Sequence, residues 1–342
     1  MVAAPKRLVV LAPNWLGDVV MALPLLVDLK RAFVQTTFAV AARAAVAPLY
    51  SMVPLVDDVI VLEGRGGVNA VASAKENARR LAKGAFDAAL LLPNSFLSAW
   101  TAVQAGIPER WGIARDLRTR LLTIAIPRPQ SYGHQAEYYQ AIGRAVGVTS
   151  GEPLAGISVP EDVLRAASGL LSQHGLESGR RFVTFAPGAA YGGAKQWLPA
   201  RFAELSRALA ADGVATVLVG SAADRHTCRE IGTQATVVDL SGQTDLTTLA
   251  GVLSQATHVV SNDSGAMHLA AAVGARVTAI FGPTNDRRTA PLRARAESPA
   301  ATIVSEDVWC RPCMLRECPI DHRCMTQVTA HQVLEAVRAV GR

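Results

Sequence analysis

The sequence predicts an α/β protein with two doubly wound parallel sheets in tandem. Short apolar segments typical of strands alternate with longer segments typical of helices, and this pattern favours parallel sheets. The alternation ends near residue 146 and restarts near residue 182, so it occurs twice along the chain. A length of 342 residues, of which 50% are hydrophobic, is sufficient for two domains with buried cores.

The first half is expected to contain four strands with helices between them. The expected strands are Arg7–Ala12, Thr37–Ala41, Asp58–Leu62 and Asp87–Leu92. The expected helices are Asp18–Phe33, Ala44–Met52, Val68–Lys83, Ser95–Ala105 and His134–Val146.

The second half repeats the pattern with five strands. The expected strands are Phe182–Ala186, Ala215–Gly220, Val237–Leu240, His258–Ser261 and Val277–Phe281. The expected helices are Pro199–Ala211, Asp224–Thr233, Leu246–Gln255 and Gly265–Val273.

A polar stretch, Gly147–Arg180, separates the halves and holds one expected helix, near Glu161–His174. We place the domain boundary near its end, which gives domains of residues 1–175 and 176–342. The last helix, within residues 329–341, could pack on either domain. Open parallel sheets bind ligands beyond the carboxyl ends of their strands, so we expect a cleft where these ends of the two sheets face each other.

The formal charge of +6 fits an acidic ligand or an anionic membrane face, but an Arg-rich surface that only keeps the protein soluble explains it equally well. This charge gives no indication of nucleic-acid binding. The N-terminal apolar run is interrupted by Pro13 and Asn14, which does not resemble a secretory signal. No stretch approaches the ~20 apolar residues of a spanning helix. We therefore expect a soluble, cytoplasmic protein.

The first candidate for chemistry is Asp18, which follows the first expected strand and a turn containing Gly17. A carboxylate at the mouth of a parallel sheet suits a general base. The alternative is a helix cap at the positive end of the helix, and position alone favours it. The glycine fingerprint G-x-G-x-x-G is absent here, which argues against a dinucleotide oxidoreductase.

The second candidate is the glycine-rich loop from Gly188 to Trp197, which follows the first strand of the second half. Its backbone N–H groups are suited to face an anion, and Lys195 adds a point charge for phosphate. An ordinary exposed lysine on a mobile loop is an equally good interpretation of this feature alone.

The third candidate is a strand-to-helix junction containing Asp263, Ser264, Gly265 and His268. Small residues at a helix N-terminus form a ready anion site, and Asp263 can bind sugar hydroxyls. A plain N-cap and a core histidine are the alternatives for Ser264 and His268. Thr284, after the next strand, offers a further polar group.

Four of the five cysteines lie in one short segment, with the spacing Cys-x2-Cys-x4-Cys-x5-Cys. The first pair suits zinc, but the later spacings do not match common zinc fingers, so a metal, a redox pair and reduced thiols all remain open. Because the segment follows the last expected strand, we expect it to lie away from the site loops and to be dispensable for chemistry. Its cysteines are Cys310, Cys313, Cys318 and Cys324.

Together and in this order, these segments resemble glycosyltransferase family 9, the ADP-heptose:lipopolysaccharide heptosyltransferases. The Trp15–Asp18 turn, the Gly188–Pro199 loop and the segment Asn262–Ala271 carry the resemblance, and Phe281–Thr284 follows at the right distance. The cysteine segment is similar to the C-terminal segment of heptosyltransferase II. The resemblance covers essentially the whole chain.

The resemblance implies a GT-B fold, with an acceptor-binding N-terminal domain and a donor-binding C-terminal domain. It implies ADP-L-glycero-β-D-manno-heptose as the donor, and heptosyl-Kdo-lipid A at the inner face of the inner membrane as the acceptor. It implies inverting transfer, for which no cofactor is required. It leaves open a relative that uses another nucleotide sugar or acceptor, a GT-B-like epimerase and a non-catalytic nucleotide-sugar binding protein. The oligomeric state stays open.

Residue by residue, the resemblance implies that Asp18 is the base. It assigns the donor to Gly188, Lys195, Asp224, Asp263, Ser264, Gly265, His268 and Thr284. Where hydroxyl residues are expected in the donor loop, this chain has Ala189 and Ala190, which favours backbone N–H groups as the phosphate contacts. For the acceptor or anionic lipid we name Trp15, Arg115, Arg118 and Arg120, with a solvated Arg-rich loop as the alternative.

Overall fold

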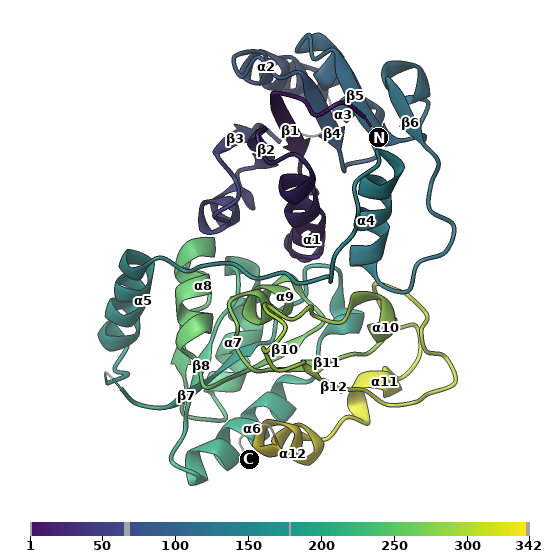
Figure 1. The fold of residues 1–342 in the computed structure, drawn as a ribbon. Coiled ribbons are helices and arrows are strands. Elements are labelled where there is room, and N and C mark those ends of the chain that lie inside the picture. Colours follow the sequence, from purple (N-terminus) through teal and green to yellow (C-terminus); the bar gives the residue numbers. More distant parts are fainter. Residues whose placement is uncertain (1, 65–68, 178, 340–342) are drawn as a thin grey trace. The chain divides into compact units, whose positions relative to one another are not determined.

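The computed structural model describes residues 2–64, 69–177 and 179–339, and the chain divides into two compact units, Met1–Leu154 and Ala155–Arg342. Each unit contains one six-stranded sheet flanked by helices (Figure 1). All the strand pairs in both sheets are parallel. The prediction of two parallel sheets in tandem is therefore confirmed.

The first sheet has the strand order β3-β2-β1-β4-β5-β6. Its strands are β1 (Arg7–Leu11), β2 (Thr37–Arg43), β3 (Asp58–Leu62), β4 (Ala88–Leu91), β5 (Glu109–Ile113) and β6 (Ile124–Ile126). The unit's helices are α1 (Leu16–Ala32), η1 (Ala47–Met52), α2 (Ala70–Ala82), α3 (Phe96–Gln104), η3 (Thr119–Leu121) and α4 (Gln135–Ala145).

The second sheet has the order β12-β11-β10-β7-β8-β9. Its strands are β7 (Phe182–Ala186), β8 (Ala215–Leu218), β9 (Val238–Asp239), β10 (His258–Asn262), β11 (Val277–Ile280) and β12 (Thr302–Val304). The longer helices are α5 (Glu161–Gln173), α6 (Pro199–Ala211), α7 (Arg225–Gly232), α8 (Leu246–Gln255), α9 (Gly265–Ala272) and α12 (Ala330–Ala339). Short helices are η4 (Gly193–Lys195), η5 (Ala222–Asp224), α10 (Asp286–Thr289) and α11 (Arg323–Thr326).

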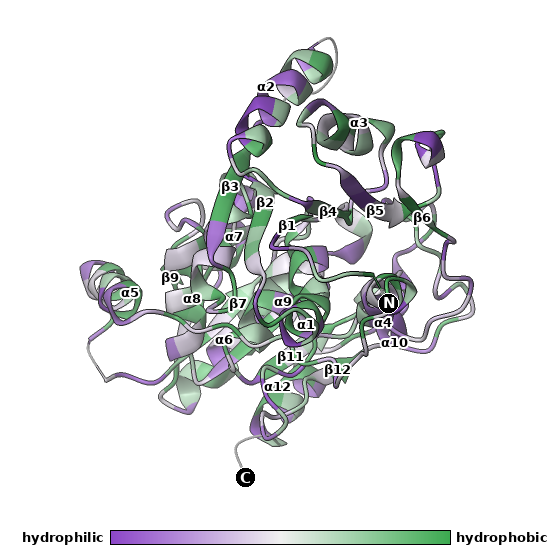
Figure 2. Cartoon of the chain, turned by 45° about the horizontal axis from the view of Figure 1, so that its top comes forward, coloured by the Kyte–Doolittle hydropathy of each residue, from purple (hydrophilic) through white to green (hydrophobic). Residues whose placement is uncertain are grey.

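Apolar residues explain why the central strands form. Every residue of β4, β7, β10 and β11 is buried, as expected for parallel strands covered on both faces. Figure 2 shows hydrophobic strands β2 and β3, while hydrophilic and hydrophobic residues alternate along α2. The core of each unit is therefore the layer between its sheet and its helices.

The strand order reverses between β1 and β4 in the first sheet and between β7 and β10 in the second. In open parallel sheets such a switch point leaves a crevice at the carboxyl ends of the strands, where ligands bind. The segments that follow β1, β7 and β10 are the ones that carry Asp18, Lys195 and Asp263.

Three strands and the domain boundary differ from the expectation. β5, β6 and β12 were not expected, because β5 begins with Glu109 and Arg110 and the other two have only three residues each. Helix α5 packs against α8, and it therefore belongs to the second unit, which begins before the expected boundary at residue 175. Helix α12 packs against α6 in that same unit. The expected helix start at Val68 and the end of the last expected helix, at residues 340–341, lie outside the described residues.

No helix in the described part of the chain has the length and apolar character needed to cross a bilayer.

Candidate functional site

Asp18 lies in the first turn of α1, directly beyond β1 at the switch point of the first sheet. The helix begins at Leu16, so its N-cap residue is Trp15, and the interpretation of Asp18 as the N-cap does not hold. The hydroxyl of Tyr139, on α4, donates a hydrogen bond to Asp18 Oδ1 at 3.0 Å. Helices α1 and α4 pack against each other, which brings these two residues together.

Tyr139 was not found from the sequence, because nothing in the pattern of α4 distinguishes this tyrosine from its neighbour Tyr138. Its pKa is raised well above the usual value, chiefly by burial and further by the Asp18 carboxylate. The phenol therefore stays protonated and can donate to Asp18 across the physiological range. This bond fixes the orientation of the carboxylate.

The residues expected to contact the acceptor separate into two kinds. Trp15 is 60% exposed, and Arg115 and Arg120 are exposed as well. Arg118 has no exposed surface, so its assignment as an acceptor contact is wrong. Its guanidinium donates to the carbonyls of Ile113 and Pro93 and to the side chain of Asn94, and it thereby ties the end of β5 to the end of β4.

The expected donor residues do come together in the second unit. Lys195 Nζ lies 2.6 Å from Asp263 Oδ2, and the two side chains are 14% and 5% exposed. The hydroxyl of Thr284 donates to the same Asp263 oxygen at 2.6 Å. A lysine after β7, a carboxylate after β10 and a hydroxyl after β11 thus form one contiguous polar group at the carboxyl end of the sheet.

A buried amide that the sequence analysis did not single out connects two of these loops. Asn262 has no exposed surface; its Nδ2 donates to the carbonyl of Pro187 at 2.7 Å, and its Oδ1 accepts from the N–H of Trp197 at 3.1 Å. The loop after β7 is therefore held at both of its ends by the residue that precedes Asp263. The signal was available in principle, because a polar residue at the end of a buried strand requires hydrogen-bond partners.

Ser264 is the N-cap residue of α9, but its side chain makes no cap hydrogen bond to the helix backbone. Its hydroxyl lies 3.2 Å from that of Ser261 instead. The backbone N–H groups of the first turn, beginning with Gly265, are thus not satisfied by this cap, as the expected anion site requires. His268 is 3% exposed, one turn into the helix.

Asp224 lies beside Gly188. The resemblance assigns both residues to the donor site, and their proximity agrees with that assignment. A Cβ atom added at Gly188 would be 2.4 Å from Asp224 Oδ1, so only glycine permits this approach. The other carboxylate oxygen of Asp224 accepts from the N–H and the hydroxyl of Ser221, which orients the side chain.

The backbone N–H groups of the donor loop are largely committed to the protein. Those of Gly192 and Lys195 donate to carbonyls within the loop. That of Gly193 donates to Glu317 Oε1 at 3.0 Å, and that of Ala194 donates to the carbonyl of Arg316 at 2.9 Å. The expectation that N–H groups replace the missing hydroxyls as phosphate contacts is therefore wrong for these four residues.

These bonds also correct the expected place of the cysteine segment. The segment does not lie away from the donor loop; it packs directly against it. The hydroxyl of Tyr191 donates to the carbonyl of Met314 at 2.8 Å, and His322 Nε2 lies 2.7 Å from the carbonyl oxygen of Ala194. The parallel topology explains this, because the chain beyond β12 returns across the carboxyl end of the sheet.

All five cysteines are free thiols. Burial, with a smaller contribution from the other three thiols of the segment, raises the pKa of Cys324 to about 11. Within residues 2–64, 69–177 and 179–339, no three His, Cys, Asp or Glu side chains are gathered closely enough to hold a metal ion. The disulfide alternative is not realised in this structure.

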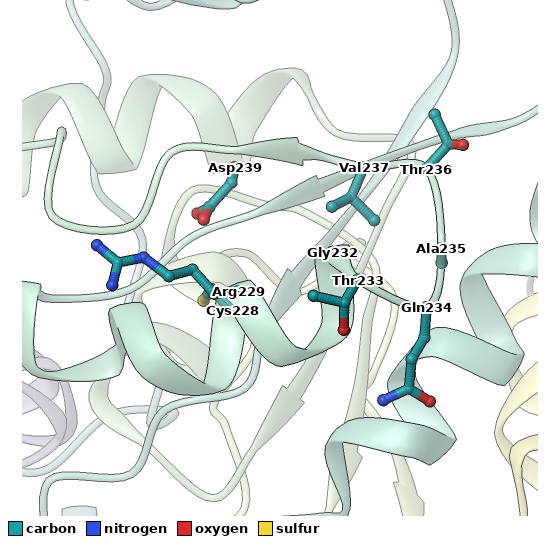
Figure 3. A pocket seen from close by; sticks show the side chains of 9 residues that line it. All are labelled: Cys228, Arg229, Gly232, Thr233, Gln234, Ala235, Thr236, Val237 and Asp239. Carbon is teal, nitrogen blue, oxygen red and sulfur yellow. The ribbon is translucent and has the colours of Figure 1, made fainter.

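A pocket of about 780 Å³ lies beside the edge strand β9 and helix α7 (Figure 3). It is lined by Cys228, Arg229 and Asp239, among others, and by none of the residues expected in the site. Burial raises the pKa of the Cys228 thiol to about 12, so this cysteine is not a nucleophile at neutral pH. This pocket is therefore separate from the polar group at the strand ends.

Comparison with known proteins agrees with this geometry. Residues 75–323 match the model of glycosyltransferase family 9 (heptosyltransferase). Lipopolysaccharide heptosyltransferase 2 of Escherichia coli (strain K12) is 31% identical over 303 residues, which cover 85% of this chain and 86% of the relative. The protein of the same name from Salmonella typhimurium (strain LT2) is 32% identical over 305 residues, with the same coverage of both chains.

Solved structures show the same fold. The structure of E. coli ADP-heptose LPS heptosyltransferase II superposes with a TM-score of 0.82 at 29% identity, covering 98% of each chain. A family 9 glycosyltransferase from Veillonella parvula superposes with a TM-score of 0.85 at 22% identity, over 98% of this chain and 97% of that one. The predicted GT-B fold class is confirmed. The chain belongs to glycosyltransferase family 9, the heptosyltransferase family, and is a glycosyltransferase.

Proposed function

We propose that this enzyme transfers L-glycero-D-manno-heptose from ADP-heptose to the inner core of lipopolysaccharide, with heptosyl-Kdo-lipid A as the acceptor. The observation that carries the proposal is the group formed by Lys195, Asp263 and Thr284 at the carboxyl ends of β7, β10 and β11. An ammonium group beside an uncapped helix N-terminus suits a diphosphate, and a buried carboxylate suits sugar hydroxyls. The heptose donor and the acceptor are inferred from the family and from the relatives' names.

Transfer breaks the anomeric C–O bond, so negative charge develops on the departing diphosphate. Lys195 and the first N–H groups of α9 are the groups of this chain that meet that charge. Asp224, held beside Gly188, is assigned to the ribose, and Thr284 holds the Asp263 carboxylate in place for the sugar. These roles together place the whole donor on the second unit.

The acceptor hydroxyl loses its proton to Asp18, which acts as general base in a single inverting displacement. A covalent route would need a carboxylate nucleophile at the anomeric carbon, and Asp18 is assigned to the proton instead. The hydrogen bond from Tyr139 to Asp18 Oδ1 orients the carboxylate that is assigned to accept the proton. Trp15, Arg115 and Arg120 are assigned to the acceptor or to the anionic surface of the inner membrane, where a cytoplasmic enzyme would meet it.

The test is incubation with ADP-heptose and defined core acceptors, followed by mass spectrometry of the products and measurement of released ADP. ADP release that depends on a heptose-bearing acceptor supports the proposal, and the anomeric configuration of the product, read by NMR, tests inversion. Equal activity with UDP-glucose, or none with any heptose donor, would refute it. Donor binding without turnover would identify a binding protein.

A further inference from the structure

The segment between β12 and α11 carries Cys310, Cys313 and Cys318, and the proposed function leaves it without a role. It binds the loop after β7 through Tyr191, Gly193 and Ala194, and the N–H of Met314 donates to the carbonyl of Pro283 in the loop after β11. Its contact with the donor loop is close, since a Cβ atom at Gly192 would lie 2.4 Å from the carbonyl oxygen of Arg316. One segment thus supports two of the three loops of the donor site.

The backbone of this segment is held in an uncommon conformation. Met314 and His322 have φ values of 60° and 55°, in the left-handed region that methionine seldom adopts and histidine adopts more readily. Such strain persists only where surrounding contacts enforce it, and it concentrates at functional sites. Here the two residues enclose the stretch whose carbonyls and side chains bond the donor loop.

The segment also brings a second cation to the site. The guanidinium of Arg316 lies over the ring of Tyr191, 5.3 Å from its centroid, and Lys195 Nζ lies 4.8 Å from the same centroid. Lys195 is neutralised by Asp263. The ion pairs found among the described residues include none formed by Arg316, which is exposed.

We propose that Arg316 is a donor-binding residue that contacts the diphosphate of the nucleotide sugar together with Lys195. The inference rests on the proposed function, because it needs a nucleoside-diphosphate donor at Lys195. Arg316 lies over the same ring as Lys195, and because Asp263 already neutralises Lys195, a diphosphate bound there brings negative charge that the guanidinium can balance. The N–H groups of residues 192–195 are bonded to the protein, so a side-chain cation beside them adds a phosphate contact that these groups do not supply.

The experiment is calorimetric titration of the full-length chain with ADP and with AMP. Arg316→Gln is expected to bind ADP about 10-fold more weakly, the loss of one charge-assisted contact, and to bind AMP almost as the wild type does. Arg316→Lys should recover part of the ADP affinity. The matched control is Arg323→Gln in the neighbouring helix α11. Arg323 lies over the ring of Trp309 and forms an ion pair with Asp321.

The outcomes separate the two proposals. If the wild type binds ADP and Arg316→Gln binds it equally well, the role of Arg316 is refuted while the proposed function stands. Equal losses of ADP and AMP affinity, or a lowered melting temperature in Arg316→Gln, would show a general effect on the loop and would also refute it. A wild-type protein that binds no ADP overturns the proposed function, and the role of Arg316 with it.

Discussion

Replacing Lys195 with methionine tests the donor site most directly. Methionine keeps most of the volume of the side chain and removes the charge. The change acts twice, because Lys195 is assigned to the diphosphate and is also the partner of Asp263 at 2.6 Å. The two effects can be measured separately, one as donor affinity and one as stability.

The magnitudes follow from burial. The two side chains are 14% and 5% exposed, so Lys195→Met leaves a buried carboxylate whose remaining hydrogen bond comes from Thr284. Breaking a buried pair on one side costs about 3–5 kcal/mol, and partial exposure of the lysine puts the expected loss near the lower end, about 3 kcal/mol. For a unit of this size that lowers the melting temperature by about 6–12 °C. Losing a charge-assisted phosphate contact costs about 1.5–3 kcal/mol, or about 10- to 150-fold in ADP affinity.

The assay combines thermal unfolding with calorimetric titration of ADP. Asp263→Asn is the informative partner variant, since it keeps the lysine and removes the carboxylate. The double variant Lys195→Met/Asp263→Asn should recover much of the stability lost in Lys195→Met, because no buried charge is left alone, but none of the ADP affinity. If Lys195→Met binds ADP as tightly as the wild type, the assignment of Lys195 to the diphosphate is wrong. If the double variant is no more stable than Lys195→Met, the buried pair is not the cause of the loss.

Three further predictions address the rest of the molecule. Asp18→Asn should lower turnover ~10²–10⁴-fold with ADP-heptose affinity unchanged, and retention of more than about a tenth of the wild-type rate would show that the base lies elsewhere. Burial lowers the pKa of His258 from 6.5 to about 4, so the folded state disfavours protonation of this residue. The free energy of unfolding should therefore be highest above pH 6.5 and fall by about 1.4 kcal/mol per pH unit from pH 6.5 toward pH 4. Melting curves at several pH values should show a shallower fall in His258→Gln. Cys324→Ser places a hydroxyl in the core and should lower the free energy of unfolding by about 1–3 kcal/mol, whereas Cys313→Ser, at an exposed position, should not change it measurably. Equal melting temperatures of the two variants would contradict this.

The central strands could be predicted because they carry runs of apolar or β-branched residues. β7, β10 and β11 are buried along their whole length, and among them β10, with His258, Ser261 and Asn262, departs most from a continuous hydrophobic segment. The edge strands could not be predicted in the same way. β12 is a three-residue strand that is only partly buried, so the hydrophobic pattern carries little information about it.

The donor residues could be located because each follows a strand of a parallel sheet, and the carboxyl ends of such strands meet at one edge. Lys195, Asp263 and Thr284 were found by this rule, and the structure brings them into direct contact. The roles of Tyr139 and Arg118 could not be predicted by this rule, because they depend on tertiary contacts that the local sequence does not indicate. The sequence predicted Arg118 to be a surface arginine. Its hydrogen bonds to the carbonyl of Ile113, at the end of β5, and to the carbonyl of Pro93, beyond β4, explain why it is buried.

The two alanines of the donor loop connect these observations. A loop with hydroxyl residues at positions 189 and 190 could bind phosphate through its own side chains, but Ala189 and Ala190 cannot. The loop cannot compensate with the N–H groups of residues 192–195, since these bond to the loop itself and to the cysteine segment. We therefore assign the anion to the ammonium of Lys195, the start of α9 and, by the proposal above, Arg316 of the segment that has taken those N–H groups. The hydrogen bonds that occupy the N–H groups of residues 192–195 therefore also hold Arg316 beside the donor loop.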